Sequence, residues 1–463
     1  MDDNKWGTSS TNRDNNQTIA TPVEDPGEIL SANDDEEIRQ FQTTFSDMID
    51  HTCSNSYENI AEFQYNSQDI FRFLFRSIIP AQEILQQDFE PESEQNLFNF
   101  EEEECLKYTF KVLDRRTNRL TIEHMPVYHK YGMQLLFRGP LQRELLTTNA
   151  IRNFFARETL RLGKAFNEPK SRKHIQAFIK IYQINLNELL EPNIQRYFTF
   201  NEFFYRKLKV DARPIDNRDD PCTLVSAADC RLILFDSISE ATRIWIKGHQ
   251  FSLEHLFEDE ILAKEFENGS IAVFRLSPAD YHRFHSPISG KIGEHMKTIT
   301  GTYYTVNPIA IREQLDVLTR NQRTMITIES NYFEKVAFVA IGALFVGSVN
   351  FTVKPHQSIE KGDELAIGVK VKIIYLGYFA YGGSTIVIVF RAGMIKWDDD
   401  LQHNSKNSME TLVRMGEHIG QRTSEEERQQ YLLDSSKDSN KNGTVTQLLC
   451  FFPNMSNLNN FKV

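Results

Sequence analysis

The chain has 463 residues, of which 40% are hydrophobic, and its 52 Lys and Arg against 64 Asp and Glu give a formal net charge of −12. This amount of apolar material excludes wholesale disorder, and the acidic balance disfavours a general nucleic-acid-binding protein, which needs a basic surface. The five cysteines form no Cys-x-x-Cys pair, a usage typical of a reducing compartment.

The N-terminal part of the chain is polar. Residues 1–36 are rich in Asn, Asp, Ser and Thr, which predicts a disordered tail. They have neither the apolar core of a secretory signal nor the Arg-rich composition of a mitochondrial presequence, so we expect an intracellular protein outside mitochondria. Residues 37–110 are predicted to be helical, with an EF-hand-like stretch whose acidic ligand positions are not filled. No apolar run is long enough for a membrane-spanning helix, so any action on a membrane is expected from its surface.

Residues 111–205 are predicted to be a helical, membrane-facing segment. Between residues 152 and 173, seven basic side chains stand against two acidic ones, although the whole chain is acidic. An apolar face beside a basic face is typical of an interfacial helix on anionic lipid, and the alternative is a solvated basic face over a core-facing stripe. The apolar residues at helical spacing are Ile151, Phe155, Leu162, Phe166, Ile175, Phe178, Ile179 and Tyr182.

Strand patterns run from about residue 222 to 392, and residues 206–420 are predicted to form the β-rich catalytic core. Residues 421–463 are polar again and are predicted to be a C-terminal tail. The sequence therefore indicates an α+β protein in which amphipathic helices precede a β-rich core, with polar disordered tails at both ends. The main strand-like runs are Leu232–Phe235, Ile271–Leu276, Met325–Glu329, Val336–Val349 and Ile386–Phe390.

Three short segments contain residues suited to chemistry. His282 and His285 lie on a turn bounded by prolines, and imidazole is the side chain best matched to proton transfer near neutral pH. Ser384 follows two glycines and precedes a strand, so the Gly383 carbonyl is left unshielded. Asp229 precedes another strand, where an aspartate can orient a histidine. The alternative is that the histidines are structural and that the other two segments are ordinary turns; no third ligand at metal-site spacing accompanies the histidines.

Asp229, His285 and Ser384 together supply an orienting group, a base and a nucleophile. On the residues alone, two kinds of enzyme stay open: a serine hydrolase and a self-processing enzyme.

Several blocks of the chain resemble the motifs of the phosphatidylserine decarboxylase family. Residues 200–209 read FNEFFYRKLK, 212–215 read ARPI, 277–287 read SPADYHRFHSP and 377–385 read GYFAYGGST. Further similar blocks lie at 246–253, 306–308, 361–364, 410–413 and 416–420. The resemblance runs from about residue 112 to 420 and, with the region 114–118, is similar to the endomembrane type rather than the mitochondrial type, without a recognisable C2 domain.

The resemblance implies a chemistry for these residues. Decarboxylation of an amino-acid head group needs an electron sink, which pyridoxal phosphate or a protein-derived pyruvoyl group can supply, and this family uses the pyruvoyl group. The resemblance implies that His285, oriented by Asp229, activates Ser384 to attack the Gly383 carbonyl. Cleavage would give chains 1–383 and 384–463, with Ser384 converted to the pyruvoyl group that forms a Schiff base with the substrate. His282 would serve in decarboxylation, and no metal is implied.

The expected function is thus a self-cleaving decarboxylase that converts phosphatidylserine to phosphatidylethanolamine and CO₂ at an anionic membrane surface, peripheral on endomembranes. The two chains are expected to stay associated, and a homodimer is left open. The alternatives are a serine hydrolase with the same three residues and a processing-defective lipid-binding paralogue. The second is suggested by an insert at residues 366–376 just before the cleavage motif. A biotinyl- or lipoyl-type carrier is disfavoured because Lys297 follows the turn at 286–290 too closely.

Overall fold

The structure is a computed structural model that describes most of the region downstream of residue 165. Three predicted segments lie outside it: the tail 1–36, the helical region 37–110 and the end of the C-terminal tail, 435–463. The described residues are 111–122, 166–244, 246, 251–294, 296–304, 316–343, 350–367 and 384–434.

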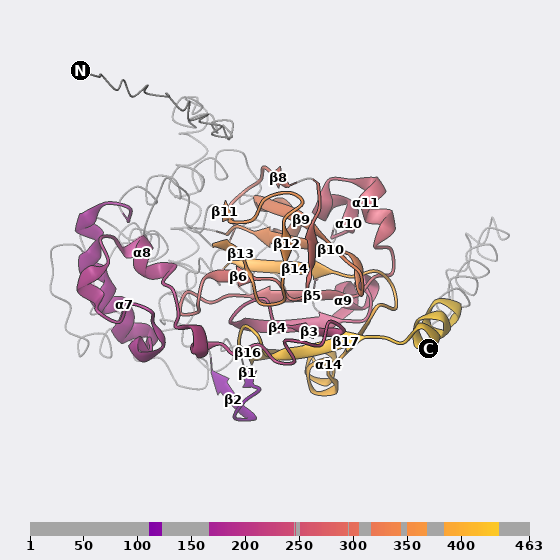
Figure 1. Ribbon diagram of the computed structural model, residues 1–463, viewed down its shortest axis with the longest axis horizontal. Helices are drawn as coiled ribbons and strands as arrows, with labels where there is room; N and C mark the ends of the chain where they lie inside the picture. Colours follow the sequence, from indigo (N-terminus) through magenta and orange to yellow (C-terminus); the bar gives the residue numbers. More distant parts are fainter. Residues whose placement is uncertain are drawn as a thin grey trace, which may run out of the picture.

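An eleven-stranded sheet forms the centre of the molecule (Figure 1). Its neighbouring strands run antiparallel, apart from β1 and β16, which are parallel. Ten strands follow one path, and β8 (Lys297–Ile299) pairs with β9 beside it. In order, the path is β12 (Ser358–Ile359), β7 (Gly290–Ile292), β9 (Arg323–Ser330), β10 (Glu334–Ile341), β14 (Thr385–Val389), β5 (Ile271–Arg275), β4 (Cys230–Phe235), β16 (Glu410–Val413), β1 (Lys111–Asp114) and β2 (Arg119–Ile122).

Two small sheets flank the large one. The first consists of β11 (Asn350–Phe351), β13 (Glu364–Ile367) and β6 (Arg283–His285), and the second of β15 (Ile395–Trp397), β17 (His418–Arg422) and β3 (Thr223–Val225).

The central strands are buried on both faces because their sequences are almost wholly β-branched, aromatic or leucine. Side chains alternate along each strand, so Val273 and Val387 enter one buried cluster while Phe274 and Ile386 enter the other. The first cluster also receives helical side chains such as Phe178. Each large apolar side chain removed from water contributes about 1.5–3 kcal/mol, so these two clusters fix the sheet.

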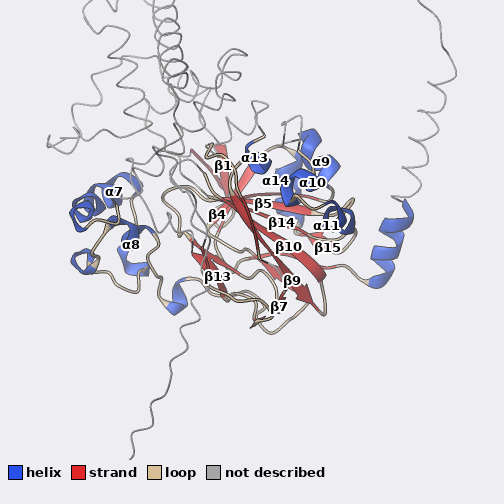
Figure 2. Ribbon diagram, turned by 90° about the horizontal axis from the view of Figure 1, so that it is seen from above, coloured by secondary structure: helices blue, strands red, loops and turns tan. Residues whose placement is uncertain are grey.

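The helices are short. Both views place α7 and α8 toward one end of the sheets and α9, α10 and α11 toward the other (Figures 1 and 2), and buried side chains of both groups enter the first cluster. The α-helices are α7 (Ile175–Tyr182), α8 (Phe200–Phe204), α9 (Ile238–Ile244), α10 (Leu253–Phe257), α11 (Glu260–Glu265), α13 (Val317–Arg320) and α14 (Asp399–Lys406). The 3₁₀ helices are η4 (Pro169–His174), η5 (Leu186–Glu188), η6 (Ile194–Arg196) and η7 (Val210–Ala212).

The α+β class is confirmed, and the predicted strand runs lie in β4, β5, β9, β10 and β14. Of the run Val336–Val349, residues 336–341 belong to β10 and residues 344–349 lie outside the described residues.

The prediction of a helical segment 111–205 is wrong at its start. Residues 111–122 form the hairpin of β1 and β2, which turns at Asn118 with a φ of 51°. The reason is tertiary: β1 pairs with β16, about 300 residues later in the chain, and such pairing overrides local propensity.

The C-terminal tail also begins later than predicted. β17 extends to Arg422, and residues 425–434 are helical. Arg428 forms an ion pair with Glu334 of β10, and the ring of Tyr431 packs against Gly393. These contacts attach the segment to the body, so a disordered tail from residue 421 is incorrect.

The second predicted amphipathic stretch turns its apolar face to the core. Ile175 and Phe178 of α7 are buried, as is Phe166 before it, which favours the core-facing alternative for this part. Residues 151–165 lie outside the described residues. Among the described helices, none has the length and hydropathy needed to cross a bilayer.

A buried ion pair links two strands of the large sheet and generates a stability prediction. Arg275 of β5 donates to Glu410 of β16, with Nε–Oε1 at 3.0 Å and Nη2–Oε2 at 2.5 Å. Loss of one partner leaves an uncompensated buried charge, which costs about 3–5 kcal/mol. We therefore expect Glu410→Gln to lower the thermal unfolding midpoint by several degrees, measured by circular dichroism. Glu425→Gln, which removes the exposed partner of Arg422, is the control, and equal effects of the two changes would contradict the prediction.

Candidate active site

The register of three central strands brings the predicted site segments to one end of the sheet. β4 and β14 lie on either side of β5 and run antiparallel to it, so Arg231 and Thr385 are both opposite Arg275. Asp229 directly precedes β4, and Ser384 directly precedes β14. Because the starts of β4 and β14 lie beside the end of β5, both residues lie where the chain leaves β5 for the histidine turn.

Backbone hydrogen bonds close this arrangement. The Leu276 amide, one residue beyond β5, donates to the Ser384 carbonyl at 2.8 Å. The His285 amide donates to the Ala227 carbonyl, also at 2.8 Å, and so ties β6 to the turn that carries Asp229. The structure thus gathers Ser384, the histidine turn and the Asp229 turn from three separate parts of the chain.

Ser384 is fully buried, and its hydroxyl has no hydrogen-bond partner among the described residues. A buried hydroxyl left unsatisfied costs about 1–3 kcal/mol, so such a group in a folded protein calls for an explanation. One explanation is that this hydroxyl is a nucleophile, which must be free to react rather than be held by a neighbour. Gly383, the predicted cleavage partner, lies outside the described residues.

The contacts of His285 define which of its nitrogens is basic. Nδ1 lies 2.8 Å from the Gly362 carbonyl oxygen, which only accepts, so Nδ1 carries the proton. Nε2 lies 3.2 Å from the Tyr281 hydroxyl, which donates to it. Nε2 is therefore the position that can take up a proton.

Burial governs the acid–base properties of this pair. It lowers the pKa of His285 below the usual value and outweighs the opposing effects of the Gly362 carbonyl and of the Glu364 and Asp229 carboxylates. Burial also raises the pKa of the Tyr281 phenol, so this hydroxyl keeps its proton and stays a donor. His285 is consequently neutral and ready to act as a base near neutral pH.

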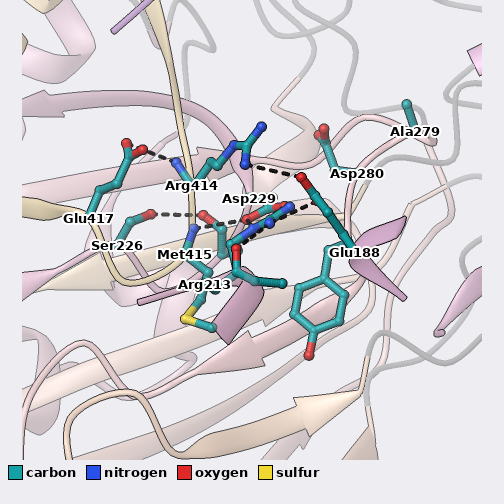
Figure 3. Close-up of polar contacts among 12 residues, drawn as sticks. Glu188, Arg213, Ser226, Asp229, Ala279, Asp280, Arg414, Met415 and Glu417 are labelled. Atoms are coloured by element: carbon teal, nitrogen blue, oxygen red, sulfur yellow. Dashed lines mark hydrogen bonds and ion pairs between the residues drawn. The ribbon is translucent and has the colours of Figure 1, made fainter. Parts of the chain in front are cut away.

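Asp229 is held by other groups than His285 (Figure 3). Arg213 binds both carboxylate oxygens, and the Met415 amide donates to Oδ1 at 2.9 Å. No hydrogen bond joins Asp229 to His285 among the residues that the structure describes. The influence of Asp229 on His285 here is that of a nearby negative charge, while the Gly362 carbonyl sets the tautomer.

His282 lies deeper, against the helix of the FNEFF block. Its ring centroid is 4.1 Å from that of Phe204, and its Nδ1 is 2.9 Å from the Asp280 carbonyl oxygen. Arg206 follows the same helix and donates to the Ala279 carbonyl at 2.8 Å, and burial lowers the pKa of its guanidinium to about 10. The residues around 200–206 therefore fix the position of the histidine turn.

Three residues of this site were not predicted from the sequence: Arg213, Tyr281 and Gly362. All three lie within blocks that resemble the family's motifs. Gly362 and Arg213 contact residues that are distant in the chain. Tyr281 lies four residues before His285, and that short spacing was a signal that could have been used. Within the described part of the chain, no three His, Cys, Asp or Glu side chains gather as a metal site.

Residues 200–421 match the family described as phosphatidylserine decarboxylase. A phosphatidylserine decarboxylase proenzyme of Fusobacterium nucleatum is 34% identical over 310 residues, which are 67% of this chain and 97% of that protein. The chain belongs to the phosphatidylserine decarboxylase family. The resemblance expected from the motifs is thus confirmed.

Longer members of the phosphatidylserine decarboxylase family are also similar. Phosphatidylserine decarboxylase proenzyme 3 of Schizosaccharomyces pombe is 43% identical over 68% of this chain and 31% of its own length. Phosphatidylserine decarboxylase proenzyme 2 of Oryza sativa is 41% identical over 67% of this chain and 48% of its own. The chain spans less than half the length of these two relatives.

The Tyr281–His285 contact leads to a titration prediction. Tyr281→Phe removes a donor that stabilises neutral His285, so the pKa of His285 should rise. The measurement is the pH titration of ¹³C-labelled histidine signals. Tyr332→Phe, at a half-exposed tyrosine, should leave this titration unchanged. A His285 pKa that stays the same or falls in Tyr281→Phe would show that the hydroxyl does not donate to Nε2.

Proposed function

We propose that this protein is a self-processing, pyruvoyl-dependent phosphatidylserine decarboxylase (EC 4.1.1.65) that forms phosphatidylethanolamine and CO₂. The observation that carries the proposal is the buried hydroxyl of Ser384, which has no hydrogen-bond partner among the described residues and is placed by strand register beside the histidine turn in a chain of this family. The names of the relatives, which call them proenzymes, agree with processing of a precursor.

In the proposed cleavage, His285 Nε2 takes the proton of Ser384 Oγ, and Oγ attacks the carbonyl carbon of Gly383. The C–N bond then breaks, and the nitrogen takes up the proton, so the amide becomes an ester. Loss of the Ser384 Cα proton breaks the Cβ–Oγ bond and releases Gly383 as a carboxylate. Hydrolysis of the remaining dehydroalanine releases ammonia and leaves a pyruvoyl group at the start of chain 384–463. The charge of Asp229 supports the protonated form of His285 during these transfers.

The surroundings of Ser384 fit the pyruvoyl group. The residue is buried, its carbonyl is held by the Leu276 amide, and the strand that follows is fixed on both sides. When present, the group supplies the electron sink that protein side chains lack. His282, buried on the same turn, is the candidate to contact the substrate carboxylate or to return a proton to Cα, a role typically worth 10²–10⁴-fold in rate.

Sheet order supports association of the two chains after cleavage. In chain 384–463, β14 lies between β10 and β5, and β16 lies between β4 and β1. β17 pairs with β3 of the other chain on one side and with β15 of its own chain on the other. Separation of the chains would expose these buried strands. A homodimer is compatible with the proposal and is not required by it.

The proposed site of action is the surface of an intracellular endomembrane, where the protein would bind peripherally to anionic lipid. The basic stretch 152–173 supports this, and so do large apolar side chains that are exposed near α7 and α8. Leu190 is 58% exposed, Phe198 72% and Val210 90%. Lys207 and Lys209 lie beside them, because the backbone of 207–209 pairs with that of 188–190. Apolar and basic groups together suit an anionic interface.

Processing gives the direct test of the function. We expect the purified protein to be two polypeptides, 1–383 and 384–463, and Ser384→Ala to be one uncleaved chain without decarboxylase activity, as measured by intact mass and by CO₂ release from phosphatidylserine. Ser270→Ala, at a buried serine on the far end of β5, should be cleaved normally. An active wild-type protein that is still a single chain would refute the pyruvoyl mechanism. Hydrolytic activity in that chain would favour the serine hydrolase, and an intact chain that only binds lipid would favour the processing-defective paralogue.

The two histidines should separate processing from decarboxylation. We expect His285→Ala and Asp229→Asn to block or strongly slow cleavage, because they remove the base and the charge beside it. His282→Ala should be cleaved but lose decarboxylation by about 10²–10⁴-fold. His403→Ala, on the exposed face of α14, is the control. Normal decarboxylation by cleaved His282→Ala would disprove the assigned role.

Membrane binding is tested by charge reversal of Arg157, Arg161 and Lys164, which lie outside the described residues. Each basic residue near an anionic surface contributes about 1 kcal/mol, so the triple change to Glu should abolish sedimentation with phosphatidylserine-containing vesicles at low salt while cleavage continues. The control reverses three exposed lysines of the catalytic body, Lys291, Lys396 and Lys406. If the first variant binds vesicles as well as the wild-type protein does, the membrane contact lies on another surface.

A further inference from the structure

The carboxylate of Asp229 is the most heavily bonded acidic group at the candidate site. Arg213 Nε lies 2.8 Å from Oδ1 and 3.0 Å from Oδ2, and Arg213 Nη2 lies 2.6 Å from Oδ2. The Met415 amide fills the remaining side of Oδ1. Both oxygens therefore have fixed donors, and the plane of the carboxylate is determined (Figure 3).

The guanidinium of Arg213 is also fixed on the side that faces away from Asp229. Its Nη1 donates to Glu188 Oε2 at 2.9 Å and to the Ala212 carbonyl at 2.7 Å. The other oxygen of Glu188 accepts from Arg414 Nη1 at 3.3 Å. Burial works against the charge of Arg213, but the hydrogen bonds and the charge of Asp229 exceed that effect and raise the pKa of the guanidinium. Arg213 is therefore a permanent cation with no freedom to turn.

A planar guanidinium suits this place better than any other cation. It presents two parallel N–H groups to one carboxylate while a third points elsewhere, which the compact ammonium of lysine cannot do. Both side chains are about nine-tenths buried, at 8% exposure for Arg213 and 11% for Asp229. A carboxylate buried to this degree keeps its charge only when it is paired.

We propose that Arg213, braced by Glu188, is a positioning residue for self-cleavage that holds the carboxylate of Asp229 in place and oriented beside His285. The inference rests on the proposed function, because it assigns Arg213 a part in the same reaction. Among the described residues, Arg213 has no hydrogen bond or ion pair with Ser384, and it acts through Asp229. The charge of Asp229 opposes the loss of basicity that burial imposes on His285. Loss of Arg213 would displace that charge.

The arrangement also joins parts of the molecule that cleavage would place on different chains. Glu188, Arg213 and Asp229 precede the cleavage site, whereas Arg414 and Met415 follow it. The charged and titratable groups around Asp229 are Arg213, Arg206, Cys230, Tyr281 and His285, with Glu188 and Arg414 behind Arg213.

The test follows cleavage of newly made full-length chain in cell-free synthesis. We expect Arg213→Ala to slow cleavage by roughly 100-fold, the effect of a misplaced catalytic group. Arg213→Lys should be intermediate, and Glu188→Gln should have a smaller effect because the amide oxygen can still accept. Added guanidinium ion should restore part of the rate.

Arg115→Ala is the matched control, since Arg115 also binds a carboxylate, that of Asp398, across the two future chains but away from the site. A purely structural role for Arg213 predicts no rescue by guanidinium and an effect like that of Arg115→Ala; this result would overturn the proposal. Circular dichroism shows whether Arg213→Lys and Glu188→Gln fold. If Arg213→Ala does not fold, the cleavage rates of these two variants still test the proposal. If the wild-type protein is cleaved and Arg213→Ala is cleaved at the same rate, the positioning role is refuted and the proposed function is not. Failure of wild type to cleave would refute the proposed function.

Discussion

The antiparallel register of β4, β5 and β14 is the constraint on which the candidate site depends. Arg231, Arg275 and Thr385 are aligned across the three strands, and this alignment places the residues that precede β4 and β14 at the end of β5. A shift of one residue in either pairing would turn the side chains of that strand to the opposite face. The buried clusters on both faces prevent such a shift, because every alternate residue has a defined apolar environment. The precision of the site is therefore a consequence of core packing.

The site combines groups that are fully satisfied with others that are not. Asp229 and both ring nitrogens of His285 have defined partners, and Arg206 anchors the turn at Ala279 through its Nη2. The hydroxyls of Ser384 and Thr385 and the Nε of Arg206 are buried without a partner in the described residues. Of these atoms, the Ser384 hydroxyl belongs to the cleavage motif, and its lack of a partner agrees with the proposed chemistry, in which the serine is consumed once and is never regenerated. The cost of the unsatisfied group is small beside the apolar burial of the surrounding strands.

Local sequence patterns predicted the parts of the fold that depend on local sequence. The runs of β-branched and aromatic residues in β4, β5, β9 and β14 identified the central strands. The prolines around His282 and His285 predicted a turn that carries both histidines; the turn is confined to residues 278–280, and His285 lies in β6, because β6 pairs with the distant β13. The hairpin of β1 and β2 was missed because its stability comes from β16, far along the chain. The Gly362 carbonyl, which orients His285, was missed for a different reason: a backbone oxygen has no signature in the sequence. The Arg213–Asp229 pair was missed because nothing in either segment specifies the other.

The place of β14 in the middle of the sheet has a consequence for refolding. In the uncut chain, pairing of β14 with β5 is a loop closure within one molecule, whose entropic cost rises only slowly with loop length. In the proposed two-chain form the same pairing would be a bimolecular association, so recovery from denaturation would depend on protein concentration. The strand would also have to enter between two neighbours that had closed up in its absence. The lifetime of the two-chain form would then be governed by its unfolding rate rather than by an equilibrium between folded and unfolded states.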